Sequence, residues 1–590
     1  MTTSIPTILR RTLRASLLVA IVPALSGCYA SFSQIDDRVS GLLDESTGDM
    51  GGDAVPAPQT WAEGTLSNGT MDTPEPPTYN PSAGDLGYES ARNDDVEAVI
   101  DRLEALLEEG GESQILTLVE AIGWSVSHGR EYQYAMETYV IECLQLLMER
   151  HLWGPRFFDT IGFDVNAAGT AGLYQTSMDL VNEFAVTQKL PYGGQVSIQY
   201  LASFAKTLQD AINDGSLDSL SSGTIVLGAQ IPLLRNAGPI AQENLIQAER
   251  DLTYAARSFE DFRRQYFYDI VADYLDLLVQ RQTLANGETS VLLYEKLAQR
   301  QRALYEAGRV RLNAAAEAEN NALREQSSQA TRWERYRLAL DRFKVRINWP
   351  VDEAVRIHHV AFAIDPPTIS MTDAVMTGLA RRLDLQTLRD QLVDRERQLR
   401  NSKNQLLPDL DLSGNIAIPS EVNEDGTTSF VPEVGDTDFN FGVELGIPLD
   451  REIEKLKVRE AQVLLERNRL QLSQAIDTAA VEIRAAVREI DTSLFALDIQ
   501  KRNVAIAKLN IESINADPDS VSVLNQLEAI RNLRSAEDSR AEAFKNLQLS
   551  IIDYLLTSGQ LRIRPDGMME TLPGMKMKPT EDLSYGDSPA

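Results

Sequence analysis

The sequence predicts a mainly α-helical chain that carries a membrane β-barrel and consists of two related halves. Three observations lead to this fold class: an internal duplication, two helical patterns of unusual length, and strands in which apolar and polar residues alternate strictly. Together they predict one long repeated architecture rather than a series of separate globular domains.

The N-terminal segment has the features of an export signal. Basic residues precede an apolar run at 15–25 that is too short to span a bilayer. The run ends in Leu25-Ser26-Gly27-Cys28, which resembles the bacterial lipobox, in which the cysteine is diacylated and becomes the new N-terminus. We therefore expect residues 1–27 to be a signal peptide and Cys28 to be the lipidation site. The alternative is an ordinary secretory signal cleaved near Ala30.

Two segments that flank the repeated region have the composition of flexible chain. Residues 28–95 are rich in Gly, Pro, Ser, Thr and acidic residues, and residues 564–590 have the same character. Neither shows a sustained apolar period, so neither buries enough apolar surface to offset the entropy of ordering. We expect a flexible N-terminal tether and a flexible C-terminal tail.

The duplication relates a first repeat at 96–350 to a second repeat at 369–563, with a connector at 351–368 between them. Three short matches occur in the same order in both halves, each at the same kind of boundary between elements. They pair 118–122 with 371–375, 231–233 with 447–449, and 312–313 with 524–525.

Strand patterns occupy the middle of each half. In the second half, apolar residues alternate with polar ones over 409–418 and 438–447, for longer than most water-soluble strands need. Apolar-out, polar-in strands of about ten residues are typical of a transmembrane barrel with a wet lumen. The first half has patterns at 225–231, 196–200 and 161–165, and we expect one of these to lie outside the barrel. An insertion at 174–205 contains the turn Pro191-Tyr192-Gly193-Gly194.

Helical patterns surround the strands. Those at 241–307 and 452–513 would each extend roughly 90 to 100 Å at the helical rise, and the second has coiled-coil spacing with one break. Shorter patterns occur at 116–149, 313–344, 371–405 and 526–556. Two short helices stacked end to end match one long helix, so each half predicts a long helix packed against two short ones.

This combination resembles the outer-membrane efflux protein family, the TolC-like exit ducts of tripartite efflux pumps and type I secretion systems. The resemblance covers about 116–560 and rests on the doubled topology and on Leu406-Leu407-Pro408, Ile447-Pro448-Leu449 and Pro232-Leu233-Leu234-Arg235. It implies a homotrimer in the outer membrane in which each chain gives four strands to a 12-stranded barrel and its helices to a periplasmic tunnel. The partners it implies are a periplasmic adaptor (membrane fusion protein), an inner-membrane transporter and outer-membrane lipid.

Trimerisation also has a physical reason. Four strands leave two open edges in lipid, where unpaired backbone groups are costly, so the sheet must close with copies of itself.

The resemblance further places the periplasmic aperture, where the tunnel meets the adaptor, at the turns between long and short helices. By position these turns contain Gly308, Arg309 and Arg311 in the first half, and Asp517 and Asp519 in the second. Ion pairs between the arginines and the aspartates would hold the aperture shut. The alternative is that the aspartates are ordinary turn residues whose carboxylates are solvated. Asn313 and Asn525 stand where family members often carry an acid.

Composition and motifs exclude several other functions. The net charge of −31 argues against a nucleic-acid partner, and Cys143, the one cysteine after Cys28, is expected to be a small buried apolar residue. None of the four His has metal-ligand spacing, and no phosphate-binding or nucleophile motif occurs, so we expect no enzyme, metal or cofactor. The main alternative is a lipid-anchored periplasmic coiled-coil scaffold without a pore. A periplasmic adaptor is a third possibility, but it would have one helical hairpin and soluble β domains.

Overall fold

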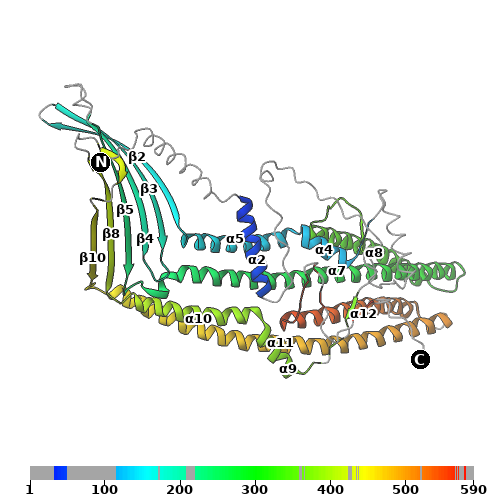
Figure 1. Ribbon diagram of the computed structural model, residues 1–590. Coiled ribbons are helices and arrows are strands. Elements are labelled where there is room, and N and C mark those ends of the chain that lie inside the picture. The colour runs from blue at the N-terminus through cyan, green and yellow to red at the C-terminus, as the bar shows by residue number, and fades with distance from the viewer. Residues whose placement is uncertain are drawn as a thin grey trace. The chain divides into compact units, whose positions relative to one another are not determined.

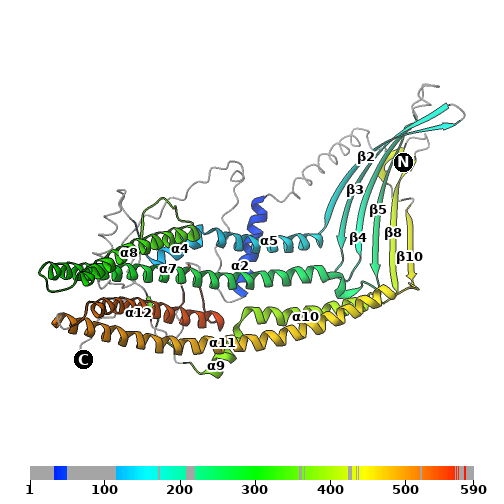
Figure 2. The same ribbon diagram turned by 180° about the vertical axis from the view of Figure 1, so that it is seen from behind.

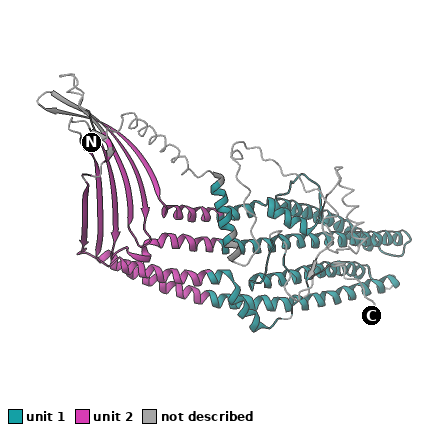
Figure 3. Cartoon of the chain, in the orientation of Figure 1, with its two compact units in different colours: residues 1–139, 256–386, 475–590 teal, residues 140–255, 387–474 magenta. Residues whose placement is uncertain are grey.

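The computed structural model describes a large part of the repeated region and one segment before it. The described residues are 32–49, 114–170, 173–207, 219–357, 362–364, 366–367, 369–422, 428–432, 435, 437–517, 521–564, 567, 569–570 and 577–579. They divide into two compact units (Figure 3). Unit 1 comprises residues 1–139, 256–386 and 475–590, and unit 2 comprises residues 140–255 and 387–474. Cys28 and Asp519 lie outside the described residues.

Both long helices are present as predicted. Helix α7 spans Glu243–Glu306 and α11 spans Glu452–Ala516, with 64 and 65 residues. The shorter helices of the two halves have similar lengths in the same order (Figure 1). They are α4 (Leu118–His128), α5 (Arg130–Leu152) and α8 (Leu312–Ile347) in the first half, and α9 (Met371–Arg381), α10 (Leu383–Asn404) and α12 (Val523–Thr557) in the second.

The helices predicted at 116–149 and 371–405 are each broken into two. Helix α4 begins with a capping box, in which the Thr117 hydroxyl accepts from the Glu120 N–H and the Glu120 carboxylate accepts from the Thr117 N–H. It ends at Gly129, where a Cβ would clash with the Ser125 carbonyl and the Tyr266 hydroxyl. The second break, at Arg382, occupies the matching place between α9 and α10. No proline marks either break in the sequence. At the first break, the Tyr266 hydroxyl approaches Gly129 so closely that no side chain fits there.

The described part of the predicted tether is a helix. Residues Phe32–Asp49 form helix α2, which buries Val39 and Leu43. Ile35, Val39, Leu42 and Leu43 have helical spacing, and this short amphipathic period is masked by the surrounding Gly-rich and Pro-rich sequence.

Four short strands make two small sheets in unit 1. In the tail, Met577–Pro579 form β11, which is antiparallel to β7 (Phe362–Ile364) from the connector. The connector also supplies β6 (Val355–Ile357), which is parallel to β1 (Gln114–Leu116). The connector and the tail are therefore partly built into the fold by backbone pairing that no side-chain period signals.

Unit 2 contains one large antiparallel sheet. Six strands follow one another in the order β10-β8-β5-β4-β3-β2, and a short strand, β9 (Thr428–Pro432), pairs with β8 off this path. The two views in Figures 1 and 2 show these six strands side by side. Their bounds are β2 Arg156–Thr170, β3 Leu173–Lys189, β4 Gln195–Thr207, β5 Ser219–Pro232, β8 Asp409–Val422 and β10 Asp438–Gly446.

The first half gives more strands to the sheet than the sequence analysis predicts. All three of its strand patterns belong to the sheet, so the expectation that one lies outside is wrong within the described structure. The insertion at 174–205 forms β3 and β4, and these two strands lie between β2 and β5. The path therefore holds six strands where the resemblance implies four.

The turn between β3 and β4 depends on two glycines. Gly193 and Gly194 have positive φ angles of 102° and 82°, which side chains with a Cβ rarely adopt. A Cβ on Gly194 would also overlap the Gln230 carbonyl of β5. The two glycines therefore let the chain reverse its direction in close contact with β5.

Candidate functional site

The register of the sheet in unit 2 separates an apolar face from a polar face. Directly paired residues of an antiparallel ladder point to the same side of the sheet. One row of such pairs crosses all six strands and is entirely apolar: Phe439, Ile416, Leu227, Ile198, Val186 and Phe157. The next row, one residue along, is Asn440, Asn415, Gly228, Ser197, Thr187 and Arg156. The alternation predicted for individual strands is thus in phase across the whole sheet.

The apolar face is exposed in the chain as described. Phe441 is 75% exposed and Val443 69% exposed on β10, and Ile161 is 69% exposed on β2 at the other end of the path. Single exposed apolar side chains are common on protein surfaces, but a contiguous face of this kind marks an interaction with lipid or protein. This face therefore needs a covering that the described chain does not supply.

Asp159 and Asn182 interrupt the apolar face. The Asn182 amide donates to the Asp159 carboxylate at 2.8 Å between β3 and β2. Their pairing partners in the register are Phe184 and Ile161, so the two polar side chains are diagonal neighbours among apolar residues. By bonding to each other they lower the cost of lying on that face.

The first predicted tip turn, in unit 1, ends α7. Gly308 has a φ of +70°, and its N–H donates to the Tyr305 carbonyl at 2.9 Å. The Arg309 N–H donates to the Leu304 carbonyl at 2.8 Å, so carbonyls of the last helical turn are satisfied by a left-handed glycine cap. The Arg309 and Arg311 side chains are exposed, and Arg311 is the residue before α8.

The second tip turn, also in unit 1, follows α11. Asp517 is exposed directly after the helix, and its N–H approaches the Ser513 carbonyl at 3.4 Å. The Ser522 hydroxyl caps α12 by accepting from the Asn525 N–H at 3.3 Å. This backbone contact at Asn525 does not depend on its amide side chain. The opposed charges of the two turns remain a prediction.

A buried cluster lies between the helices that meet these turns. Tyr294 and Leu297 of α7, Ala318 and Ala322 of α8, and Leu527 and Ile530 of α12 form it, with Ile511 of α11 packed against it. The Tyr294 hydroxyl donates to the Leu527 carbonyl at 3.2 Å. Both halves of the duplication thus share one core in unit 1.

Comparison with solved structures identifies this architecture. VceC, an outer membrane protein of Vibrio cholerae, is 13% identical with a TM-score of 0.56, over 75% of this chain and 96% of VceC. The Campylobacter jejuni CmeC outer membrane channel is 15% identical with a TM-score of 0.52, over 75% of this chain and 85% of CmeC. The outer-membrane channel OprN is 14% identical with a TM-score of 0.55, over 82% of this chain and 98% of OprN. This chain has an outer-membrane channel fold. No family model and no curated protein matches the sequence.

The outer-membrane channel fold confirms the predicted mainly helical, TolC-like architecture and the resemblance to outer-membrane efflux channels. None of the described helices is long and apolar enough to cross a membrane.

Within unit 2, ion pairs around the buried Asp394 join α7 to α10, and no pattern in the sequence predicts them. Asp394 of α10 is 6% exposed, forms an ion pair with Arg250 of α7 and accepts a hydrogen bond from the Tyr254 hydroxyl. Arg397 donates to Asp394 at 2.7 Å and pairs with Glu243 at 2.9 Å. We call these five residues the Asp394 network. The apolar period around them gives no sign of it, because partners about 140 positions apart meet only after folding.

A second ionic cluster, in unit 1, joins α8 to α12. The buried carboxylate of Glu325 accepts from Arg332 at 2.7 Å and from Arg534 at 2.5 Å. Asn286 of α7 donates to Asp538 of α12 at 2.8 Å. The two halves of the channel fold are therefore tied by charge as well as by apolar packing.

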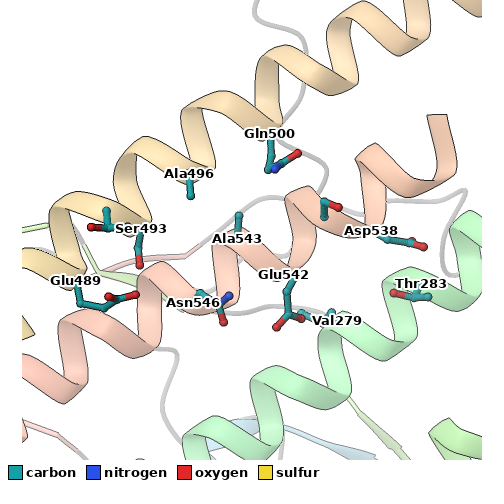
Figure 4. A pocket seen from close by; sticks show the side chains of 12 residues that line it. Val279, Thr283, Glu489, Ser493, Ala496, Gln500, Asp538, Glu542, Ala543 and Asn546 are labelled. Atoms are coloured by element: carbon teal, nitrogen blue, oxygen red, sulfur yellow. The ribbon is translucent and has the colours of Figure 1, made fainter. Parts of the chain in front are cut away.

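A groove of about 520 Å³ lies between α7, α11 and α12 in unit 1 (Figure 4). Three of its twelve lining residues are acidic: Glu489, Asp538 and Glu542. Burial raises the pKa of Asp538, and the hydrogen bond from Asn286 partly offsets this effect. In the described part of the chain no three His, Cys, Asp or Glu side chains are grouped to hold a metal. The groove is thus a seam between helices that is lined by both polar and apolar side chains.

Proposed function

We propose that three copies of this chain form an exit duct in the outer membrane, serving a tripartite efflux pump or a type I secretion system. In this proposal the sheets of unit 2 close into a membrane barrel, and the helices form a periplasmic tunnel. The duct is passive, so energy comes from an inner-membrane transporter joined to it by a periplasmic adaptor. Cys28 carries the lipid anchor.

The observation that carries the proposal is the apolar row that crosses all six strands. In water such a face is unfavourable, at about 25 cal/mol per Å² of apolar surface left exposed. In lipid it is matched to its surroundings, and the polar row next to it faces a wet lumen. The solved neighbours VceC, CmeC and OprN, which carry the same fold, are an outer membrane protein and two outer-membrane channels.

The open edges of the sheet support an oligomer. Within the described residues, the outer edges of β2 and β10 have no strand beside them. Unpaired backbone groups cost several kcal/mol each in the hydrocarbon region, so a membrane sheet must close. A coiled-coil scaffold without a pore does not require such a sheet.

The proposal is tested with the purified full-length chain. On unboiled gels we expect a heat-sensitive band of about three times the mass of the chain, and in planar bilayers we expect discrete single-channel currents. A chain that migrates as a monomer without heating and gives no currents would contradict the duct and favour the scaffold. Boiled protein added to the same bilayer serves as the control.

A further inference from the structure

Among the described elements, the strands β3 and β4 have no counterpart in the second half of the chain. Leu118 precedes its match Met371 by 253 residues, whereas Ile231 precedes its match Ile447 by 216. The first half therefore has 37 additional residues between these points, as expected for one extra hairpin. The second half passes from α10 through β8 and β10 to α11, and in the described part of the chain between those two strands there is one further strand, the short β9.

The extra hairpin lies within the sheet. β3 pairs with β2 over fifteen positions, from Arg156↔Thr187 to Thr170↔Leu173. β4 pairs with β5 over twelve positions, from Gln195↔Gln230 to Lys206↔Ser219. The hairpin thus separates β2 from β5, and its removal from the sheet would break two ladders.

The extra hairpin also continues both faces. Val186 and Ile198 carry the apolar row across β3 and β4, and Thr187 and Ser197 carry the polar row. Leu180 and Ile198 are 41% and 49% exposed on the apolar face. A hairpin that capped the sheet from outside would bury this face or break its phase, and neither occurs.

The number of strands decides whether copies can join edge to edge. Every pair along the path is antiparallel, so with six strands the two edge strands, β2 and β10, run in opposite directions. The β10 edge of one copy and the β2 edge of the next can therefore continue the same antiparallel ladder. Both edges present exposed apolar side chains on the same face, Phe441 and Val443 on β10 and Ile161 and Phe163 on β2.

We propose that β2 of each copy pairs with β10 of a second copy, so that three copies close an eighteen-stranded barrel in which β3 and β4 are part of the wall. This inference rests on the trimeric duct proposed above. Barrel diameter grows roughly linearly with strand number, so this barrel is about one and a half times as wide as a twelve-stranded one. Barrels of this strand number enclose an aqueous channel. Such a channel is wide enough for a large cargo or for a segment that plugs the lumen.

Cysteine pairs in the full-length, membrane-inserted protein test the pairing between copies. In a Cys143→Ala background, Val443→Cys on β10 is combined with one cysteine on β2, and a short bis-maleimide is added. Because paired residues share a face, positions Phe157, Ile161, Phe163 and Val165 should give a covalent band of three times the chain mass, strongest at one or two of them. The matched controls Phe158, Thr160 and Gly162, on the other face, should give at least tenfold less.

Two pairs within one chain test whether the extra hairpin is in the wall. Ile198→Cys with Leu227→Cys joins β4 to β5, and Phe163→Cys with Leu180→Cys joins β2 to β3. Both should cross-link within one chain in the same membranes, as the register requires.

The outcomes separate the inference from the proposed duct. Covalent trimers through β2, together with both pairs within the chain, support the eighteen-stranded barrel. A further variant combines Val443→Cys with Ile198→Cys of β4. Trimers cross-linked through that pair, or trimers without the β4–β5 link, overturn the inference and leave the trimeric duct intact. No cross-link between copies at any position overturns both.

Discussion

Charged side chains hold α7 and α10 together in unit 2, and Asp394 contacts three of the other four residues of its network. Its carboxylate is 6% exposed and interacts with Arg250, Tyr254 and Arg397. A buried ion pair is not strongly stabilising in itself, but removing one partner leaves an uncompensated charge.

Asp394→Asn should therefore lower the free energy of unfolding by about 3–5 kcal/mol. Urea denaturation followed by circular dichroism measures this change. The matched control is Glu396→Gln on the same helix, whose pair with Arg469 is half exposed on both sides at 3.5 Å, and whose loss should cost at most about 1 kcal/mol. Equal effects of the two substitutions would contradict the role given to the Asp394 network.

Cys143 behaves as the sequence predicts, as a buried residue on α5. Burial raises the pKa of its thiol to about 11 from an ordinary value of 9.0, although Arg150 opposes the shift. Because the thiolate is the reacting form, two pKa units mean about 100-fold less reactive thiol at neutral pH.

Folded protein should therefore resist N-ethylmaleimide at pH 7.5, and the labelling rate should rise about tenfold per pH unit until the pH nears the raised pKa. Mass spectrometry of folded and urea-treated samples gives the two rates. Rapid labelling of the folded chain at neutral pH would show that the thiol is accessible.

The tip turns are the subject of a third prediction at the residue scale. If Arg309 and Arg311 tie to Asp517 and Asp519, then Asp517→Ala combined with Asp519→Ala should raise single-channel conductance several-fold by opening the aperture. Each surface tie contributes at most about 1 kcal/mol, so several must act together. A conductance equal to that of the unaltered protein would reject the gate and leave these residues as ordinary turn acids.

At the scale of elements, the alternation of β10 divides lipid-facing from lumen-facing positions. Val443 and Asn440 lie on opposite faces of the same strand, and both are exposed in the described chain. Only Val443 belongs to the apolar face.

Val443→Lys should therefore destabilise the inserted protein by about 2–4 kcal/mol if this position lies near the bilayer midplane, whereas Asn440→Lys should change stability by less than about 1 kcal/mol. The fraction of heat-sensitive trimer in outer-membrane extracts, measured against urea concentration, compares the two. A greater loss for Asn440→Lys would mean that the faces are assigned the wrong way round.

At the scale of the whole molecule, two different features attach the proposed duct to the membrane: the lipid on Cys28 and the barrel. The barrel buries a far larger apolar surface than acyl chains alone, which bind a membrane reversibly unless two signals act together.

Cys28→Ala should therefore leave the trimer inserted and conducting once the chain is exported. Carbonate extraction of membranes, followed by gels without heating, provides the measurement. Release of the variant as a soluble helical chain would instead support the periplasmic scaffold.

The sequence by itself determined the features that depend on local period. The lengths of α7 and α11, the alternation in β8 and β10, and the matched order of elements in the two halves all follow from patterns within a few tens of residues. Local patterns suffice there because a helix or a strand must repeat its apolar residues at its own period.

Only the tertiary structure decided which distant segments meet. The sequence locates the insertion at 174–205, but it does not show that the insertion lies between β2 and β5. That order depends on which backbones pair, and all strands with the same alternation can pair equally well. The Asp394 network, the break at Gly129 and the pairing of β11 with β7 likewise rest on contacts between residues more than 100 positions apart. The sequence thus determines the alternation of apolar and polar residues along each strand. The number of strands that share the apolar face is determined by how six strands assemble.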